Sequence, residues 1–142
     1  MDVYAMESMP NQLELFDTMD VKIVDISAGK DHAAAVDDQG RLWVWGGKSG
    51  FLEPNVVEEM PGGVVGVECG DQVTAAFTED GAVWTMSHGG GKGGIAKGCL
   101  ATGTDKGERK PREVLSVSEE KTGGRLIGGS MGWGHGGFLV EV

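Results

Sequence analysis

This chain of 142 residues has only two cysteines, Cys69 and Cys99, and only three histidines. Two isolated cysteines are too few for a disulfide framework or a four-ligand zinc site, so we expect ordinary buried thiols in a reducing compartment. No cysteine or carboxylate stands at ligand spacing from the histidines. The sequence therefore predicts no metal and no cofactor.

Long apolar runs are also missing, since no stretch approaches the ~18 apolar residues that cross a bilayer. The first ten residues, MDVYAMESMP, lack the basic start and apolar centre of a signal peptide. They are too acidic for a mitochondrial transit peptide. We expect an intracellular protein, in the cytoplasm or an unidentified organelle, that is not secreted and has no membrane partner.

Positive charge is scarce: 12 basic residues stand against 22 acidic ones, for a net charge of −10. Nucleic-acid backbones require clustered Lys and Arg, so an acidic body makes a nucleic-acid partner unlikely. The exception is residues 88–112, which carry six basic and two acidic residues. Any contact with nucleic acid would be weak and made through this segment.

Catalytic motifs are absent as well. Residues 46–49 read GGKS, like the end of a phosphate-binding loop, but Leu42 stands where the first glycine of that motif belongs. No GxSxG element or other arrangement of nucleophile and base is present. We expect no catalytic residues and no enzyme activity.

Glycine is abundant, at 26 residues, without the Gly-X-Y period of collagen. The interleaved Val, Ile, Leu and Trp argue against disorder, and short strands joined by glycine turns give this composition. No segment has a convincing helical period. The sequence predicts an all-β fold.

A short signature recurs three times. It begins at Gly29, at Gly70 forty-one positions later, and at Gly132 after a further sixty-two, each time before a small or apolar run. The first two copies continue into a glycine turn and a tryptophan, again forty-one positions apart. Repeats of this length with several strands each are typical of propellers and solenoids. The shared positions, for which we predict structural roles in the repeat, are Gly29, His32, Gly40, Trp43, Gly70, Gly81, Trp84, Gly132 and His135.

This pattern resembles the repeat of the regulator of chromosome condensation family, which reads as a strand, Gly-x-x-His, a small apolar run, an Asp-Gly turn and an aromatic strand closing with Trp-Gly. The first copy follows it from Ile23 to Gly46, whereas the second has Val73 in place of the histidine. The third keeps Gly132 and His135. The resemblance covers about residues 10–142 and implies propeller blades of four-stranded antiparallel sheets.

We predict a flexible acidic N-terminal arm at 1–9 and a partial or split β-propeller at 10–142. Its repeat units cover about 10–52, 53–107 and 108–142, with a basic glycine-rich insertion at 88–110. Propellers of the family have seven blades, and two and a half units would leave strand edges and one apolar face uncovered. We expect other protein chains, or copies of this one, to complete the propeller.

The predicted function is a non-catalytic protein–protein interaction or scaffold module built into a larger assembly. The alternative, implied by the resemblance, is guanine-nucleotide exchange on a small GTPase. The basic insertion is interpreted either as a partner-binding segment or as a solvated loop whose charges balance the acidic body. The partner-binding candidates are Lys92, Lys97, Lys106, Arg109, Lys110 and Arg112.

His32 and His135, which occupy equivalent positions, are expected to make hydrogen bonds that tie neighbouring strands, while His88 has no visible partner in the sequence. The acidic pairs at 37–38 and 79–80 lie in equivalent turns and are expected to be exposed. Trp43 and Trp84 are expected to pack within blades.

Overall fold

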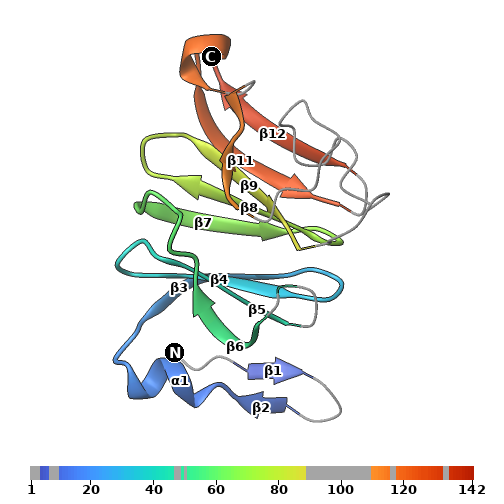
Figure 1. Cartoon of the computed structure of the whole chain (residues 1–142). Helices are drawn as coiled ribbons and strands as arrows, with labels where there is room; N and C mark the ends of the chain where they lie inside the picture. The colour runs from blue at the N-terminus through green and yellow to red at the C-terminus, as the bar shows by residue number, and fades with distance from the viewer. Residues whose placement is uncertain are drawn as a thin grey trace.

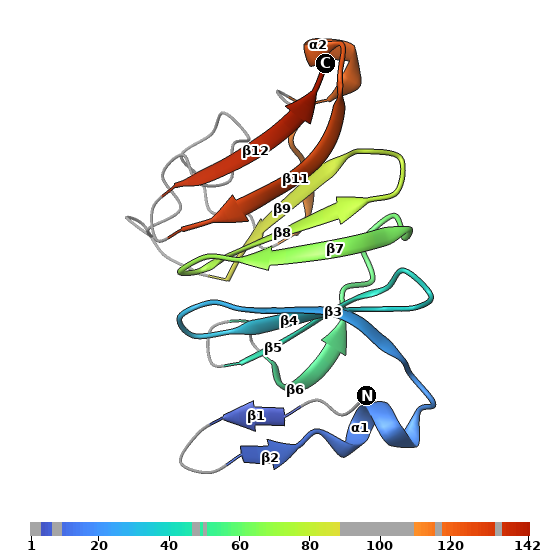
Figure 2. The same cartoon turned by 180° about the vertical axis from the view of Figure 1, so that it is seen from behind.

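The computed structural model describes residues 4–6, 10–46, 49, 51–88, 110–115, 118–132 and 135–142. Its antiparallel sheets are stacked on one another as a fan, with the N-terminal hairpin at one end and the last strand at the other (Figures 1 and 2). Two of the sheets have four strands each. The predicted fold of four-stranded antiparallel sheets is therefore confirmed.

The sheets follow one another along the chain. The first blade orders its strands β3 (Ile23–Ala28), β4 (Ala33–Asp37), β5 (Leu42–Gly46) and β6 (Phe51–Val56). The second blade contains β7 (Val64–Cys69), β8 (Val73–Thr78), β9 (Val83–Ser87) and β10 (Arg112–Glu113) in the same order. The third pairs β11 (Arg125–Met131) with β12 (Gly136–Glu141). A separate hairpin pairs β1 (Tyr4–Met6) with β2 (Pro10–Gln12).

Two short helices were not predicted. They are α1 (Glu14–Thr18) and α2 (Glu119–Thr122), of five and four residues. A helix this short spans little more than one turn, so it leaves no periodic apolar pattern in the sequence.

The predicted repeat units and the blades of the structure are offset from each other by about one strand. The predicted boundary between residues 52 and 53 falls inside β6, which closes the first blade. Tyr4–Met6 of the predicted arm pairs with Pro10–Gln12. Residues 89–109 of the predicted insertion, and the boundary between 107 and 108, lie outside the described residues.

The three blades repeat one another in register as well as in order. The pairing of the first two strands shifts between Ile23 and Asp25, between Val64 and Gly66, and between Leu126 and Gly128. These irregularities stand at equivalent repeat positions. The β11–β12 pair therefore has the geometry of the first half of a blade.

Side chains on each second strand alternate between the layer before and the layer after, as period-two geometry requires. On β4, Ala35 packs with Phe16 of α1, whereas Ala34 and Val36 face the second blade. One repeat later, Ala76 faces back to the first blade and Ala75 faces the third. The core between the first two blades consists of Ala34, Val36, Leu42, Val44, Val57, Val64, Val67, Cys69, Ala76 and Met86.

Helix α1 covers the face of the first blade that points away from the second. Phe16 lies edge-on to Trp43 and Trp45, with ring centroids 5.3 and 6.1 Å apart. The three rings are almost entirely buried. Edge-on aromatic pairs contribute about 0.5–1.5 kcal/mol beyond the area they bury. The helix thus takes the place that a preceding blade would occupy.

Near the inner strands the main chains of successive blades touch. A Cβ on Gly29 would lie 2.1 Å from the carbonyl oxygen of Gly70, and one on Gly70 would lie 2.4 Å from that of Gly132. The glycine N–H in each copy donates to the carbonyl of the residue three positions on, at 2.7–2.8 Å. Only glycine permits this approach.

Candidate functional site

The first and second blades are joined by side chains of β3 that accept hydrogen bonds from the backbone of β7. Asp25 Oδ2 accepts from the N–H of Val67, and Ser27 Oγ accepts from the N–H of Cys69, both at 2.9 Å. Each bond connects residues 42 positions apart, about one repeat. The two inner strands are therefore held together without forming a ladder.

Two buried histidines meet at the same junction. His32 Nε2 lies 3.0 Å from Thr74 Oγ1, and His88 Nε2 lies 2.8 Å from the same oxygen. The two rings are 4.2 Å apart between centroids, at 40°. Because a hydroxyl has a single hydrogen, at least one ring must donate to Thr74 from Nε2. The histidine pair thus links the first blade to the second through one threonine.

The environment of His32 keeps its ring neutral near pH 7. Burial lowers the pKa of His32 from its usual 6.5, and the nearby charges of Asp31 and Asp71, with the Val73 backbone, oppose that effect only in part. Asp71 is itself buried, with the ammonium of Lys30 3.5 Å from Oδ1. Among the described residues, neither of its carboxylate oxygens receives a hydrogen bond.

The sequence predicted only part of this cluster. His32 makes a side-chain contact to a neighbouring element, here a strand of the next blade, while the equivalent His135 is exposed. The sequence shows no partner for His88, and in the structure its ring contacts both Thr74 and His32. It follows β9 at a position where the first repeat has Gly47, so the repeat offers no signal for it.

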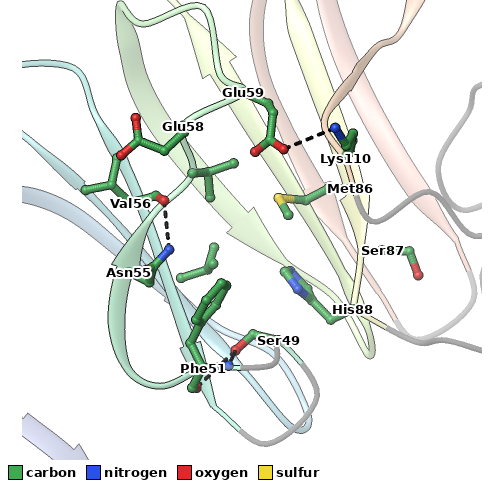
Figure 3. Close-up of a pocket in the computed structure, with 12 residues that line it drawn as sticks. Ser49, Phe51, Asn55, Val56, Glu58, Glu59, Met86, Ser87, His88 and Lys110 are labelled. Carbon is green, nitrogen blue, oxygen red and sulfur yellow. Dashed lines mark hydrogen bonds and ion pairs between the residues drawn. The ribbon is translucent and has the colours of Figure 1, made fainter.

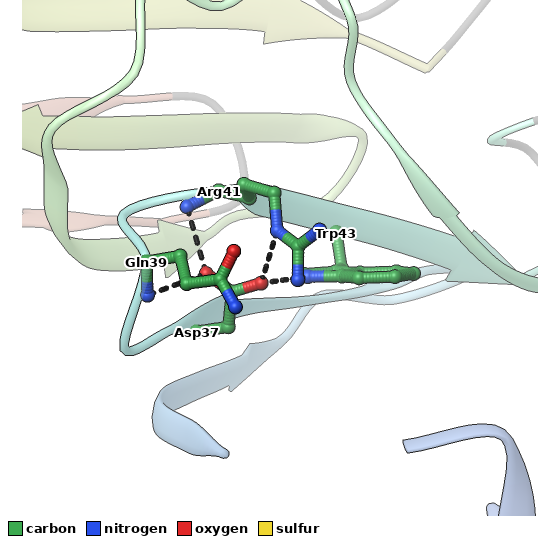
Figure 4. Close-up of polar contacts among 4 residues, drawn as sticks. All are labelled: Asp37, Gln39, Arg41 and Trp43. Carbon is green, nitrogen blue, oxygen red and sulfur yellow. Dashed lines mark hydrogen bonds and ion pairs between the residues drawn. The ribbon is translucent and has the colours of Figure 1, made fainter. Parts of the chain in front are cut away.

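Asp37 is buried, although the sequence predicted an exposed side chain in this turn (Figure 4). Its carboxylate accepts from Trp43 Nε1 at 2.8 Å and Arg41 Nε at 2.7 Å. The backbone N–H groups of Gln39 and Arg41 also donate to it. Burial alone would raise the pKa of Asp37, but these four hydrogen bonds hold it below its usual range. The neighbouring Asp38 is exposed, as are Glu79 and Asp80 of the equivalent turn.

The glycines of the two equivalent turns have the positive φ that L-residues rarely adopt, +73° at Gly40 and +83° at Gly81. The tryptophans that follow them differ in burial. Trp43 is almost fully buried, and Trp84 is partly buried against the core between the first two blades.

A hollow of about 440 Å³ lies between β6 of the first blade and β9 of the second (Figure 3). We call it the interblade groove. Its apolar lining includes Val44, Val57 and Met86, which belong to the core between the blades. Glu59 and Lys110 face each other at one end, with 3.5 Å between Oε1 and Nζ, while Ser49 and Phe51 lie at the other. The remaining lining residues are Asn55, Val56, Glu58, Ser87 and His88.

Two of the six predicted partner-binding cations fall in the described part of the chain. Lys110 and Arg112 are both exposed, and Lys110 forms the ion pair at the end of the interblade groove. Lys92, Lys97, Lys106 and Arg109 lie outside the described residues.

Within the described ranges, no group of three or more His, Cys, Asp or Glu side chains is placed to hold a metal ion. The helices described there are all too short or too polar to span a membrane.

Residues 23–49 match the family model described as "Regulator of chromosome condensation (RCC1) repeat". The human E3 ubiquitin-protein ligase HERC2 is 34% identical over 113 residues, which cover 70% of this chain and 2% of that protein. The human regulator of chromosome condensation is 34% identical over 101 residues, covering 61% of this chain and 23% of the relative.

The solved structure of Prp20p from Saccharomyces cerevisiae has the same arrangement, with a TM-score of 0.74 at 17% identity. The match covers 97% of this chain and 35% of Prp20p. At this identity the likeness concerns the fold. This chain therefore spans between a fiftieth and about a third of the proteins it resembles.

Proposed function

Because this chain belongs to the family of regulator of chromosome condensation repeats, we propose that it is a non-catalytic protein-interaction module, a propeller segment built into a larger assembly. The observation that carries the proposal is the uncovered outer face of the third blade. Leu139 on β12 is 61% exposed. A large apolar side chain exposed at a position that the preceding blades keep covered is typical of a surface that binds another protein.

The repeat indicates what such a face does elsewhere in the molecule. Leu139 occupies the position of Phe77 in the second blade and of Val36 in the first. Val36 is fully buried against the next blade, and Phe77 packs against Phe138 of the third, with ring centroids 6.5 Å apart. We propose that other protein chains, or copies of this chain, cover Leu139 in the same way. Burying such a side chain contributes about 1.5–3 kcal/mol.

Native mass spectrometry of the purified chain tests this proposal. We expect a defined oligomer for the wild-type protein and a monomer for Leu139→Lys, because the substitution places a charge on the apolar face. Leu52→Lys is the matched control, since Leu52 is 88% exposed on β6 of the first blade. A wild-type monomer with the same stability as Leu139→Lys would contradict completion by copies. Reconstitution with purified candidate chains then tests completion by others.

A second candidate is guanine-nucleotide exchange on a small GTPase. It is favoured by the 34% identity to the human regulator of chromosome condensation and by the likeness to Prp20p, whose structure is described together with its binding to Gsp1p and histones. The share of each protein that this chain spans weighs against it, as does the net charge of −10. Accelerated release of a labelled nucleotide from a loaded small GTPase would establish it over the first candidate.

The predicted basic segment belongs to the same proposal. Its cations would meet an acidic protein surface, a contact that accelerates association and weakens with salt. At its end, Arg112 is exposed on β10, and Lys110 is exposed and paired with Glu59. Charge reversal in this segment tests its contribution to partner binding.

A further inference from the structure

We propose that the interblade groove binds an extended peptide segment of a partner protein that presents one large aliphatic side chain next to a lysine or arginine. This rests on the proposed interaction function and names the chemistry of one contact. The site is separate from the outer face of the third blade, because the groove lies between the first and second blades.

The size and lining of the groove suit a single large side chain with the backbone around it. Its volume is about 440 Å³, within the range of ~300–1,000 Å³ typical of ligand pockets. Phe51 is 43% exposed on one wall, and Met86 is 8% exposed and belongs to the interblade core. Methionine adapts its shape to different apolar groups. An aliphatic side chain would therefore extend the core that already joins the two blades.

The charges at the mouth specify the neighbouring residue of the partner. Glu58 and Glu59 line the groove together with one cation, Lys110. Asn55 and Ser49 add neutral hydrogen-bonding groups. The groove is therefore acidic by one charge in a chain of net charge −10, and both favour a basic segment.

Lys110 marks the position that a partner cation would take. Its ammonium lies 3.5 Å from Glu59 Oε1, and the two side chains are 76% and 51% exposed. Exposed ion pairs of this kind are weak, so an incoming lysine or arginine can displace Lys110. Lys110 thus competes with the partner for Glu59.

Fluorescence anisotropy of the full chain with three labelled peptides tests the inference. The first peptide carries one leucine between two arginines in a glycine–serine background. The second replaces the arginines with aspartates, and the third replaces the leucine with alanine. We expect the first to bind at least about tenfold more tightly than the others, the ratio that one lost contact of about 1.4 kcal/mol produces. Equal binding of all three, or no binding of the first, would overturn the inference.

Variants locate the site. Phe51→Ala and Glu59→Gln should each weaken binding of the first peptide about tenfold, whereas Lys110→Gln should tighten it because it frees Glu59. Leu52→Ala and Glu53→Gln are matched controls, since both residues are exposed on β6 and neither lines the groove. An equal loss in the controls, or weaker binding after Lys110→Gln, contradicts the assignment.

The outcome is separable from that of the proposed function. The groove variants should leave the oligomeric state in native mass spectrometry unchanged, because the uncovered face lies on the third blade. If the peptides fail to bind while wild-type oligomers form and Leu139→Lys abolishes them, only the groove assignment is lost.

Discussion

His32 of the first blade and His88 of the second lie with their rings 4.2 Å apart, and both direct Nε2 at the hydroxyl of Thr74. Both residues are buried at the junction of the two blades, with exposed fractions of 5% for His32 and 3% for His88. Two cationic rings at this distance would repel each other. The junction is therefore stable only while at least one ring is neutral.

This arrangement makes stability dependent on pH. The pKa of His32 is lowered in the folded chain, so between that lower value and 6.5 the unfolded chain binds more protons than the folded one. We expect the free energy of unfolding to fall as the pH drops through 6.5 and to level off below the folded pKa of His32. Urea unfolding at several pH values between 5 and 7.5 measures it. His32→Gln should flatten the dependence, while His135→Gln, at an exposed equivalent position, should keep it.

The Asp37 network should contribute strongly to stability. Asp37→Asn removes the charge that Arg41 and the indole of Trp43 bind, and we expect a loss of about 2–3 kcal/mol, because hydrogen bonds to buried charged groups are costly to lose. Asp38→Asn, at the exposed neighbour, should change the free energy of unfolding by less than about 0.5 kcal/mol. Denaturant titration with tryptophan fluorescence measures both. Equal effects would contradict the assigned role.

The inner glycines can be tested by adding a single methyl group. Gly70→Ala would place Cβ 2.4 Å from the Gly132 carbonyl oxygen, so the blades must separate. We expect a loss of about 1–3 kcal/mol from this overpacking. Gly128→Ala is the control, because nothing lies within 4 Å of a Cβ there and its φ is not positive. Thermal unfolding of both variants distinguishes steric contact from a general cost of replacing glycine.

Cys69 should be unreactive in the folded chain. Burial raises the pKa of its thiol to about 11, so almost no thiolate is present at pH 8, and only the thiolate is nucleophilic. In a Cys99→Ser background, we expect alkylation by iodoacetamide at pH 8 only when denaturant unfolds the chain. Mass spectrometry of the intact protein follows the reaction. Rapid modification without denaturant would mean that the junction of the first two blades opens readily.

The basic segment should affect association more than folding. Reversing Lys92, Lys97 and Lys106 to glutamate should weaken partner binding, and the loss should be larger at low ionic strength, where charges are least screened. The same reversal at Lys22 and Lys121, which are exposed elsewhere, is the control. Unchanged binding in surface plasmon resonance at 20 mM salt would support a solvated loop instead.

The repeat predicted the fold because its signals are local. Glycines at 40 and 81 mark turns and the apolar runs at 33–36 and 73–77 mark strands, so strand order followed from the spacing of Gly29, Gly70 and Gly132. The helix over Glu14–Thr18 was missed because one turn has no detectable period. Its position depends on Phe16 packing against Trp43 and Trp45, a contact between distant residues.

The site was predicted less well, because its residues come together from distant parts of the sequence. Asp37 and Asp38 are identical in sequence terms, and only the register of the hairpin turns one toward Trp43 and the other to solvent. His88 lies outside the repeat, and its partner Thr74 lies on another strand. The interblade groove combines β6 with the residues around β9, which no local pattern brings together.

The contact between the main chains at Gly29 and Gly70 has a consequence for variation in this architecture. Because main-chain atoms limit the spacing of the two blades there, side chains farther from this contact can change without altering that spacing. The same close approach recurs between Gly70 and Gly132, so each unit carries its own spacing to the next. The outer surfaces are thus free to acquire different specificities on an unchanged scaffold.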